Sequence, residues 1–148
     1  MNAATRLLGP LAAGIAVSAL VAGSATATHS AIPLNPEQET GTVVSDGSGF
    51  FSYTIDGDEL CYTLEVRDLT AAPAAAHIHA GPRNVAGPVV VPLATPPAAT
   101  STVRDCITAV EGGALTPAEL AAIAADPKAH YVNVHTHRNT PPVRCAAS

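Results

Sequence analysis

The sequence predicts an all-β fold: an antiparallel, Greek-key-like β-sandwich with one short helix before the histidine-rich strand near the C-terminus. Three observations indicate this class. Short runs of β-branched and aromatic residues recur from residue 41 onward. Clusters of Gly, Asp, Ser and Pro separate these runs at hairpin-like intervals. Helix signals gather in a single segment, residues 116–125.

The N-terminus has the three zones of a secretion signal. A short region ends at Arg6, an apolar run covers residues 7–23, and small residues follow up to Ala27. Ala25 and Ala27 fit an A-x-A cleavage site, so residues 1–27 are interpreted as a signal peptide. The alternative is a retained membrane anchor, but the run is short for a hydrocarbon core of ~30 Å. We therefore expect a secreted, extracytoplasmic protein with no membrane span after cleavage.

The chain beyond this signal has the length of one domain, about 120 residues. Residues 28–40 are polar, contain proline and show no hydrophobic period, which is typical of a flexible lead-in. The β-rich domain is therefore expected over residues 41–145.

The charge pattern argues against nucleic acid as a partner. The formal net charge is −5, and the basic residues beyond the signal are scattered rather than clustered. They are Arg67, Arg83, Arg104, Lys128, Arg138 and Arg144. The partner expected for an exported domain of this kind is an unidentified extracellular protein or a component of the cell surface.

The first strands are expected over residues 41–45, 49–55 and 60–68, with Asp56-Gly57-Asp58 as the turn between the last two. In the third run every second residue is apolar, which places one face of that strand in the core. These apolar residues are Leu60, Tyr62, Leu64 and Val66.

The second half of the chain alternates strands with one helix. Thr116 is a predicted N-cap, Pro117 suits the first helical position, and Glu119 completes a capping box. The helix is expected to end near Ala125, because Pro127 disfavours helical geometry in the residue before it. The strands expected here cover residues 76–79, 87–93, 102–110 and 131–137.

Three cysteines lie in the exported part, where disulfides persist. Cys61 and Cys106 both fall in strand-like runs. A bridge between them would close a loop of about 45 residues and stabilise the fold by about 3–4 kcal/mol on the chain-entropy model. Cys145 is then left over near the C-terminus, with an intermolecular partner, a reactive role or no role at all.

Four of the six histidines form two H-x-H pairs inside predicted strands. They are His77, His79, His135 and His137. A spacing of two residues puts both rings of a pair on one face of a strand. If the two strands are neighbours, four neutral imidazoles converge, which suits copper or zinc. Tyr131 and Asn133 share the face of the second pair and could orient its rings. The structural alternative is that the imidazoles donate hydrogen bonds to backbone carbonyls and hold loops.

The same segments carry a family resemblance. Residues 76–81 (AHIHAG), 87–91 (GPVVV) and 131–136 (YVNVHT) together resemble the CHRD domain, which is named from chordin and is widespread in secreted bacterial proteins. The similarity extends over about residues 41–144. It implies an extracytoplasmic β-sandwich with a disulfide at the Cys61 and Cys106 positions and no catalytic residues to carry over. The family usually continues into a further strand, so the segment 141–145 implies a shortened one here.

Three functions remain open from the sequence. The first is a non-enzymatic binding or structural module of the cell exterior, which follows from the predicted secretion signal and the family resemblance. The second is a copper- or zinc-binding protein that uses the paired histidines. The third is a superoxide-dismutase-like enzyme, which rests on architectural analogy alone. No catalytic residue is assigned, since no serine has a nucleophile-elbow context.

We expect the exported protein to start at Thr28, because cleavage after Ala27 leaves that residue at the N-terminus. N-terminal sequencing or intact-mass measurement of protein recovered from the culture medium checks this. A product that keeps residues 1–27 would contradict it and would favour the membrane anchor.

Overall fold

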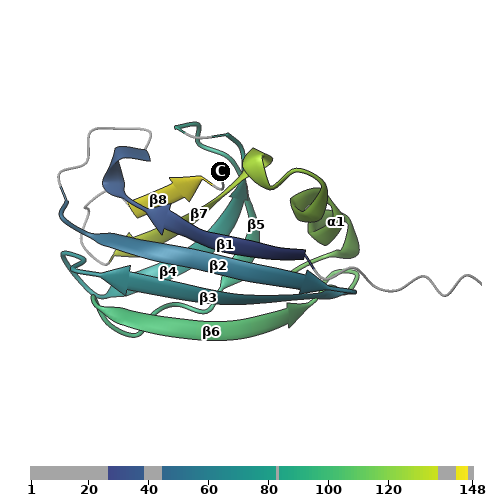
Figure 1. Ribbon diagram of the computed structural model, residues 1–148, viewed down its shortest axis with the longest axis horizontal. Coiled ribbons are helices and arrows are strands. Elements are labelled where there is room, and N and C mark those ends of the chain that lie inside the picture. Colours follow the sequence, from purple (N-terminus) through teal and green to yellow (C-terminus); the bar gives the residue numbers. More distant parts are fainter. Residues whose placement is uncertain (1–26, 39–44, 83, 137–142, 147–148) are drawn as a thin grey trace, which may run out of the picture.

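Two antiparallel sheets of four strands pack face to face in a sandwich, which confirms the predicted fold class (Figure 1). The computed structural model describes residues 27–38, 45–82, 84–136 and 143–146. The first sheet has the order β1 (Ala27–Leu34), β2 (Ser48–Asp56), β3 (Glu59–Arg67), β6 (Ser101–Thr108). The second has the order β5 (Val89–Leu93), β4 (Pro73–Ala80), β7 (His130–Thr136), β8 (Val143–Ala146). The helical elements are η1 (Pro36–Gln38), α1 (Pro117–Ala125) and η2 (Pro127–Ala129).

The β2–β3 hairpin forms where the sequence predicts it. Gly57 has a φ of 60°, a left-handed conformation that glycine adopts without steric penalty. The strands then pair without interruption from Asp56 opposite Glu59 to Ser48 opposite Arg67. Side chains alternate between core and surface along both strands. The predicted core face of β3 is confirmed, since all four of its apolar residues are buried.

The core lies between the two sheets and is built of aliphatic side chains with a few aromatic rings. The most deeply buried side chains come from both sheets and from the segment before α1. They include Leu34, Leu60, Leu64, Val66, Val91, Leu115 and Val134. Burial of each such side chain contributes about 1.5–3 kcal/mol relative to exposure, so the sandwich depends on this layer.

Helix α1 closes one end of the sandwich, as Figure 1 shows. The Thr116 hydroxyl accepts a hydrogen bond from the Glu119 backbone N–H, and the Glu119 carboxylate accepts one from the Thr116 N–H. This is the capping box that the sequence predicts. Leu120 and Ile123 lie on the buried face of the helix. The helix ends at Ala125, as expected.

The disulfide between Cys61 and Cys106 is confirmed. The two residues are directly opposite each other on β3 and β6. The bridge therefore ties an edge strand of the first sheet to its neighbour and encloses a loop that contains β4 and β5. A disulfide of this kind is compatible with an extracellular location.

The expectation of a flexible lead-in over residues 28–40 is wrong for its larger part. Residues Ala27–Leu34 form β1, which pairs with β2. Ile32 and Leu34 are 8% and 2% exposed and belong to the core. Two buried apolar residues are too few to produce a recognisable alternation of polar and apolar residues in the sequence. The segment is a strand because it pairs with β2. The strand expected over residues 41–45 lies mainly outside the described residues.

A final strand, β8, is present where the resemblance implies a shortened one. It pairs with β7 from Val143 opposite Val134 to Ala146 opposite Tyr131. Its four residues cover the edge of β7. Strand β8 also lies near β1 of the other sheet and near η1, which follows β1. Cys145 occupies the β8 position opposite Val132. Within the described parts of the chain, no helix has the length and apolar character needed to cross a membrane.

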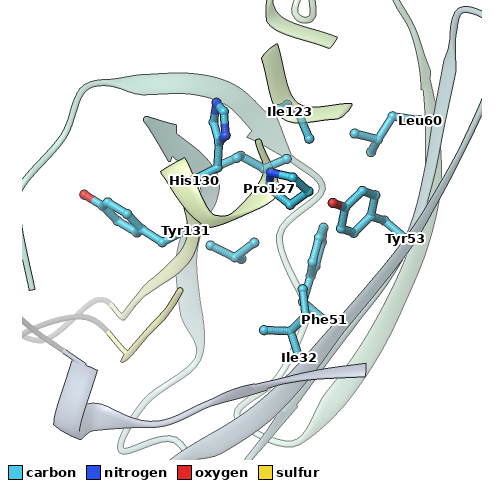
Figure 2. A pocket seen from close by; sticks show the side chains of 10 residues that line it. Ile32, Phe51, Tyr53, Leu60, Ile123, Pro127, His130 and Tyr131 are labelled. Carbon is cyan, nitrogen blue, oxygen red and sulfur yellow. The ribbon is translucent and has the colours of Figure 1, made fainter. Parts of the chain in front are cut away.

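A small apolar cavity lies between the sheets under α1 (Figure 2). Phe51 and Tyr53 line it from β2, and Ile123 and Pro127 line it from the opposite side. The Tyr53 hydroxyl is buried and has no hydrogen-bond partner among the described residues. Burial raises the pKa of Tyr53 from 10.0 to about 12. The neutral phenol therefore suits the folded state, and the phenolate does not.

We expect Tyr53 to make stability fall at alkaline pH. Its pKa is raised on folding, so the stabilisation is fully present below the unfolded value of 10.0 and is lost as pH rises towards about 12. The loss is on the order of 2 kcal/mol. Urea unfolding of wild type and Tyr53→Phe, at neutral pH and at stepwise higher pH, measures it.

The Tyr53→Phe protein should keep its neutral-pH stability and lose less of it in alkali. Tyr62→Phe is the comparison at neutral pH, because the Tyr62 hydroxyl accepts a hydrogen bond of 2.6 Å from the Ala94 N–H. Burial raises the pKa of Tyr62 as well, so the comparison is not made in alkali. That variant should lose about 1 kcal/mol at neutral pH. Equal alkaline sensitivity of Tyr53→Phe and wild type would contradict the assignment.

Candidate metal centre

The pairing of β4 with β7 brings the two H-x-H segments side by side. The strands are antiparallel, with Ala75 opposite His135, His77 opposite Asn133 and His79 opposite Tyr131. Because strand residues alternate between faces, Ala76, Ile78, Val132 and Val134 enter the core. The histidines, Asn133 and Tyr131 share the opposite face. The predicted neighbourhood of the two strands is therefore present.

Three of the four predicted ligands come together. Ligand atoms of His77, His79 and His135 all lie within 4.8 Å of one another. The ring centroids of His77 and His79 are 5.8 Å apart, and those of His77 and His135 are 5.5 Å apart. Both pairs meet edge to face. The fourth predicted ligand, His137, lies outside the described residues.

This polar face is covered rather than open to solvent. His79, Tyr131 and Asn133 are 7%, 3% and 0% exposed, whereas His77 and His135 are half-buried. Polar and apolar residues alternate along β7, which predicts that its polar face is exposed to solvent or lines a pocket. In the structure this face is largely enclosed. Water therefore competes weakly for the nitrogen atoms of His79, whereas the His77 and His135 side chains keep partial contact with solvent.

His79 is held in one orientation by two contacts. Its Nδ1 lies 2.9 Å from the Gly87 carbonyl oxygen, and since a carbonyl only accepts, Nδ1 donates. Its ring stacks on Tyr131, with centroids 4.9 Å apart and planes 6° from parallel. In a neutral imidazole the Nδ1 proton leaves the lone pair on Nε2. A backbone carbonyl on the second ring nitrogen is the usual arrangement for a histidine that binds metal.

The loop from Gly81 to Pro88 supplies that carbonyl. The Gly87 N–H donates a 2.9 Å hydrogen bond to the Tyr131 hydroxyl, so one residue contacts both stacked rings. The Ala80 N–H donates to the Pro88 carbonyl, which draws the loop back over β4. A β-carbon at Gly87 would collide with the Ala80 carbonyl oxygen. Only glycine fits this close approach.

Sequence reasoning did not find Gly87 as a residue of the site. It placed Gly87 at the start of the strand expected over residues 87–93, and it gave the orientation of the rings to Tyr131 and Asn133 alone. The signal available was the Gly-Pro pair that precedes the apolar strand at 89–91. His130 lies outside the cluster, because it takes the alternate side of β7, and its Nδ1 donates to the Asp126 carbonyl at 3.0 Å.

The three imidazole nitrogens favour a metal ion of intermediate softness. Three neutral imidazoles suit copper or zinc and disfavour calcium or magnesium, which prefer oxygen ligands. In a tetrahedral site with metal–nitrogen bonds of ~2.0 Å, the donor atoms lie ~3.3 Å apart. The observed limit of 4.8 Å is therefore within about 1.5 Å of the donor spacing in such a site. A second cluster contains Cys61 and Cys106, but their sulfur atoms are bonded to each other and are not thiolate ligands.

Comparison with known proteins gives one match. A family model described as the CHRD domain matches residues 21–142, which is most of the chain. The match includes both H-x-H segments and the Gly81–Pro88 loop. No curated protein and no solved structure matches the chain.

We expect Gly87→Ala to disturb the histidine cluster from outside it. The added methyl group displaces the Gly87 carbonyl from His79 Nδ1, so the stability should fall by about 2–3 kcal/mol. Long-range ¹H–¹⁵N spectra of the metal-free protein should show His79 protonated at Nδ1 in wild type and as a tautomer mixture in the variant. Gly57→Ala is the control: its φ of 60° makes alanine unfavourable there without a steric collision, so this variant should also be less stable but keep the wild-type His79 tautomer. A wild-type tautomer pattern in Gly87→Ala would contradict this role.

Proposed function

Since the chain belongs to the CHRD domain family, we propose that it is a secreted, non-enzymatic module that binds a copper or zinc ion through His77, His79 and His135. The observation that carries the proposal is the convergence of three imidazoles from two neighbouring strands, with ligand atoms within 4.8 Å of one another. Histidines with purely structural roles need no such convergence.

The surroundings of the cluster support metal binding. His79 already has the hydrogen bond that a metal-bound imidazole uses on its second nitrogen. His77 Nδ1 is buried and has no hydrogen-bond partner among the described residues. A bound cation would give such a nitrogen a partner. The fourth ligand that the sequence pattern predicts, His137, lies outside the described residues.

Several features support a binding module at the cell exterior. The N-terminal segment has the pattern of a cleavable signal. The Cys61–Cys106 disulfide suits an oxidising compartment. The described histidine cluster contains no carboxylate that could serve as a general base beside the metal. The bound ion then either is the cargo or holds the outer face of β4 and β7 in shape for a partner at the cell surface.

Metal analysis tests this function. Purified protein is expected to contain close to one equivalent of copper or zinc, or to take up one equivalent of Zn²⁺ or Cu²⁺ by titration calorimetry. His77→Ala/His79→Ala removes two of the three imidazoles and should abolish this uptake. The affinity should also fall as the pH is lowered, because protons compete for the same nitrogen atoms.

His29→Ala is the matched control. His29 stacks on Tyr53 from β1, in the other sheet, and does not belong to the histidine cluster, so its loss should leave uptake unchanged. An absence of uptake by wild type, or equal uptake by the double variant, would refute the metal function. The histidines would then be structural residues of a partner-binding module.

A further inference from the structure

Asn133 is the most deeply buried polar side chain of the described sandwich. It is 0% exposed, in the middle of β7. Neither its carboxamide oxygen nor its carboxamide nitrogen has a hydrogen-bond partner among the described residues. Buried polar side-chain atoms almost always have a partner, and a buried group without one costs about 1–3 kcal/mol. An apolar residue at this position would avoid that cost, so the carboxamide calls for an explanation outside folding.

The position of Asn133 suggests the explanation. It is directly opposite His77 in the β4–β7 pairing, and residues so placed have β-carbons about 4.5–5.5 Å apart. Along its own strand it lies between Tyr131 and His135, on the same face as both. Asn133 therefore adjoins His77 and His135 on the face that carries the histidine cluster.

The neighbouring histidine does not satisfy this carboxamide. His77 Nδ1 is also buried without a hydrogen-bond partner among the described residues, although the two side chains face each other. On the far side of the cluster, His79 Nδ1 and the Tyr131 hydroxyl are both bonded to Gly87. If Asn133 served only to orient His77, a hydrogen bond between them would be expected. Both groups are therefore without a protein partner among the described residues, which leaves room for a third species between them.

We propose that the Asn133 carboxamide oxygen is a metal donor, which makes the site a His₃–Asn site. This inference rests on the proposed metal function and specifies the ligand set. A cation among the imidazoles accepts a lone pair from Oδ1 and so gives this buried oxygen a partner. Three nitrogens and one oxygen complete the four-coordinate shell that zinc prefers. The carboxamide oxygen is a neutral, hard ligand in the sense of hard and soft Lewis bases. The site therefore favours Zn²⁺ or Cu²⁺ over Cu⁺, because Cu⁺ prefers soft sulfur ligands.

Two substitutions at Asn133 separate a metal donor from a structural residue. Asn133→Leu removes both unpartnered atoms at similar volume, so the metal-free protein should be as stable as wild type or more stable. The same variant should bind Zn²⁺ at least about tenfold more weakly. Asn133→Asp keeps the oxygen and buries a charge, so it should destabilise the metal-free protein while restoring or tightening Zn²⁺ affinity. Thermal melts in chelator and Zn²⁺ titrations of each protein measure these changes.

Val134→Ala is the matched control, because Val134 is equally buried on the opposite face of the same strand. It should lower the melting temperature and leave the Zn²⁺ affinity unchanged. In wild type, the side-chain carboxamide ¹³C and ¹⁵N resonances of Asn133 should shift on Zn²⁺ addition, and those of Asn35 should not. This measurement needs no variant to fold.

The inference and the proposed function fail in different ways. Wild type that takes up Zn²⁺ while Asn133→Leu binds it equally well, or while the Asn133 resonances stay in place, would overturn the Asn133 assignment alone. Loss of metal-free stability in Asn133→Leu, or no recovery of affinity in Asn133→Asp, would also overturn it and would indicate a structural carboxamide. Wild type that takes up no Zn²⁺ or Cu²⁺ would overturn both.

Discussion

The antiparallel pairing of β4 with β7 is the constraint on which the core and the candidate site both depend. Each strand has a side-chain period of two, so one register assigns every residue of the pair to a face. In the observed register Ile78 lies opposite Val132 on the core side, and His77 lies opposite Asn133 on the other. A slip of one residue would expose the aliphatic side chains and bury the imidazoles in the core. The hydrophobic core therefore holds the histidines together.

The polar face of this pair is unfavourable by ordinary folding criteria. Asn133 and His79 are buried there, and polar atoms of Asn133 and His77 have no described hydrogen-bond partner. The rest of the sandwich is locally consistent: strands alternate, the helix is capped, and a disulfide ties β3 to β6. Natural sequences that depart from such consistency at one place usually do so at a functional site. Most of these departures lie in the three-imidazole cluster, and the Tyr53 hydroxyl and Asn35 Oδ1 are other buried atoms without a partner among the described residues.

The Gly81–Pro88 loop links backbone geometry to the chemistry of the cluster. Its return over β4 brings the Gly87 peptide between His79 and Tyr131, where the carbonyl accepts from the imidazole and the N–H donates to the phenol. The orientation of His79 is thus fixed by main-chain atoms, which do not rotate as side chains do. A metal ligand held in this way loses little conformational freedom on binding.

The sequence by itself determined the elements with strong local signals. Alternation placed β2 and β3 and the core face of β3, the capping box placed α1, and the H-x-H pairs marked β4 and β7, on which His77, His79 and His135 share one face. Family motifs and the positions of Cys61 and Cys106 predicted the sandwich and its disulfide, and all of these are observed.

Tertiary structure alone decided the rest, because those features depend on partners distant in the sequence. Residues Ala27–Leu34 become β1 only by pairing with β2, and β8 exists only against β7. No local pattern shows that Asn133 is fully buried or that Gly87 contacts His79, which lies eight positions earlier in the chain. Burial and loop closure depend on which surfaces pack against each other, so they are properties of the folded sheets. The sequence pattern shows only where polar and apolar residues alternate.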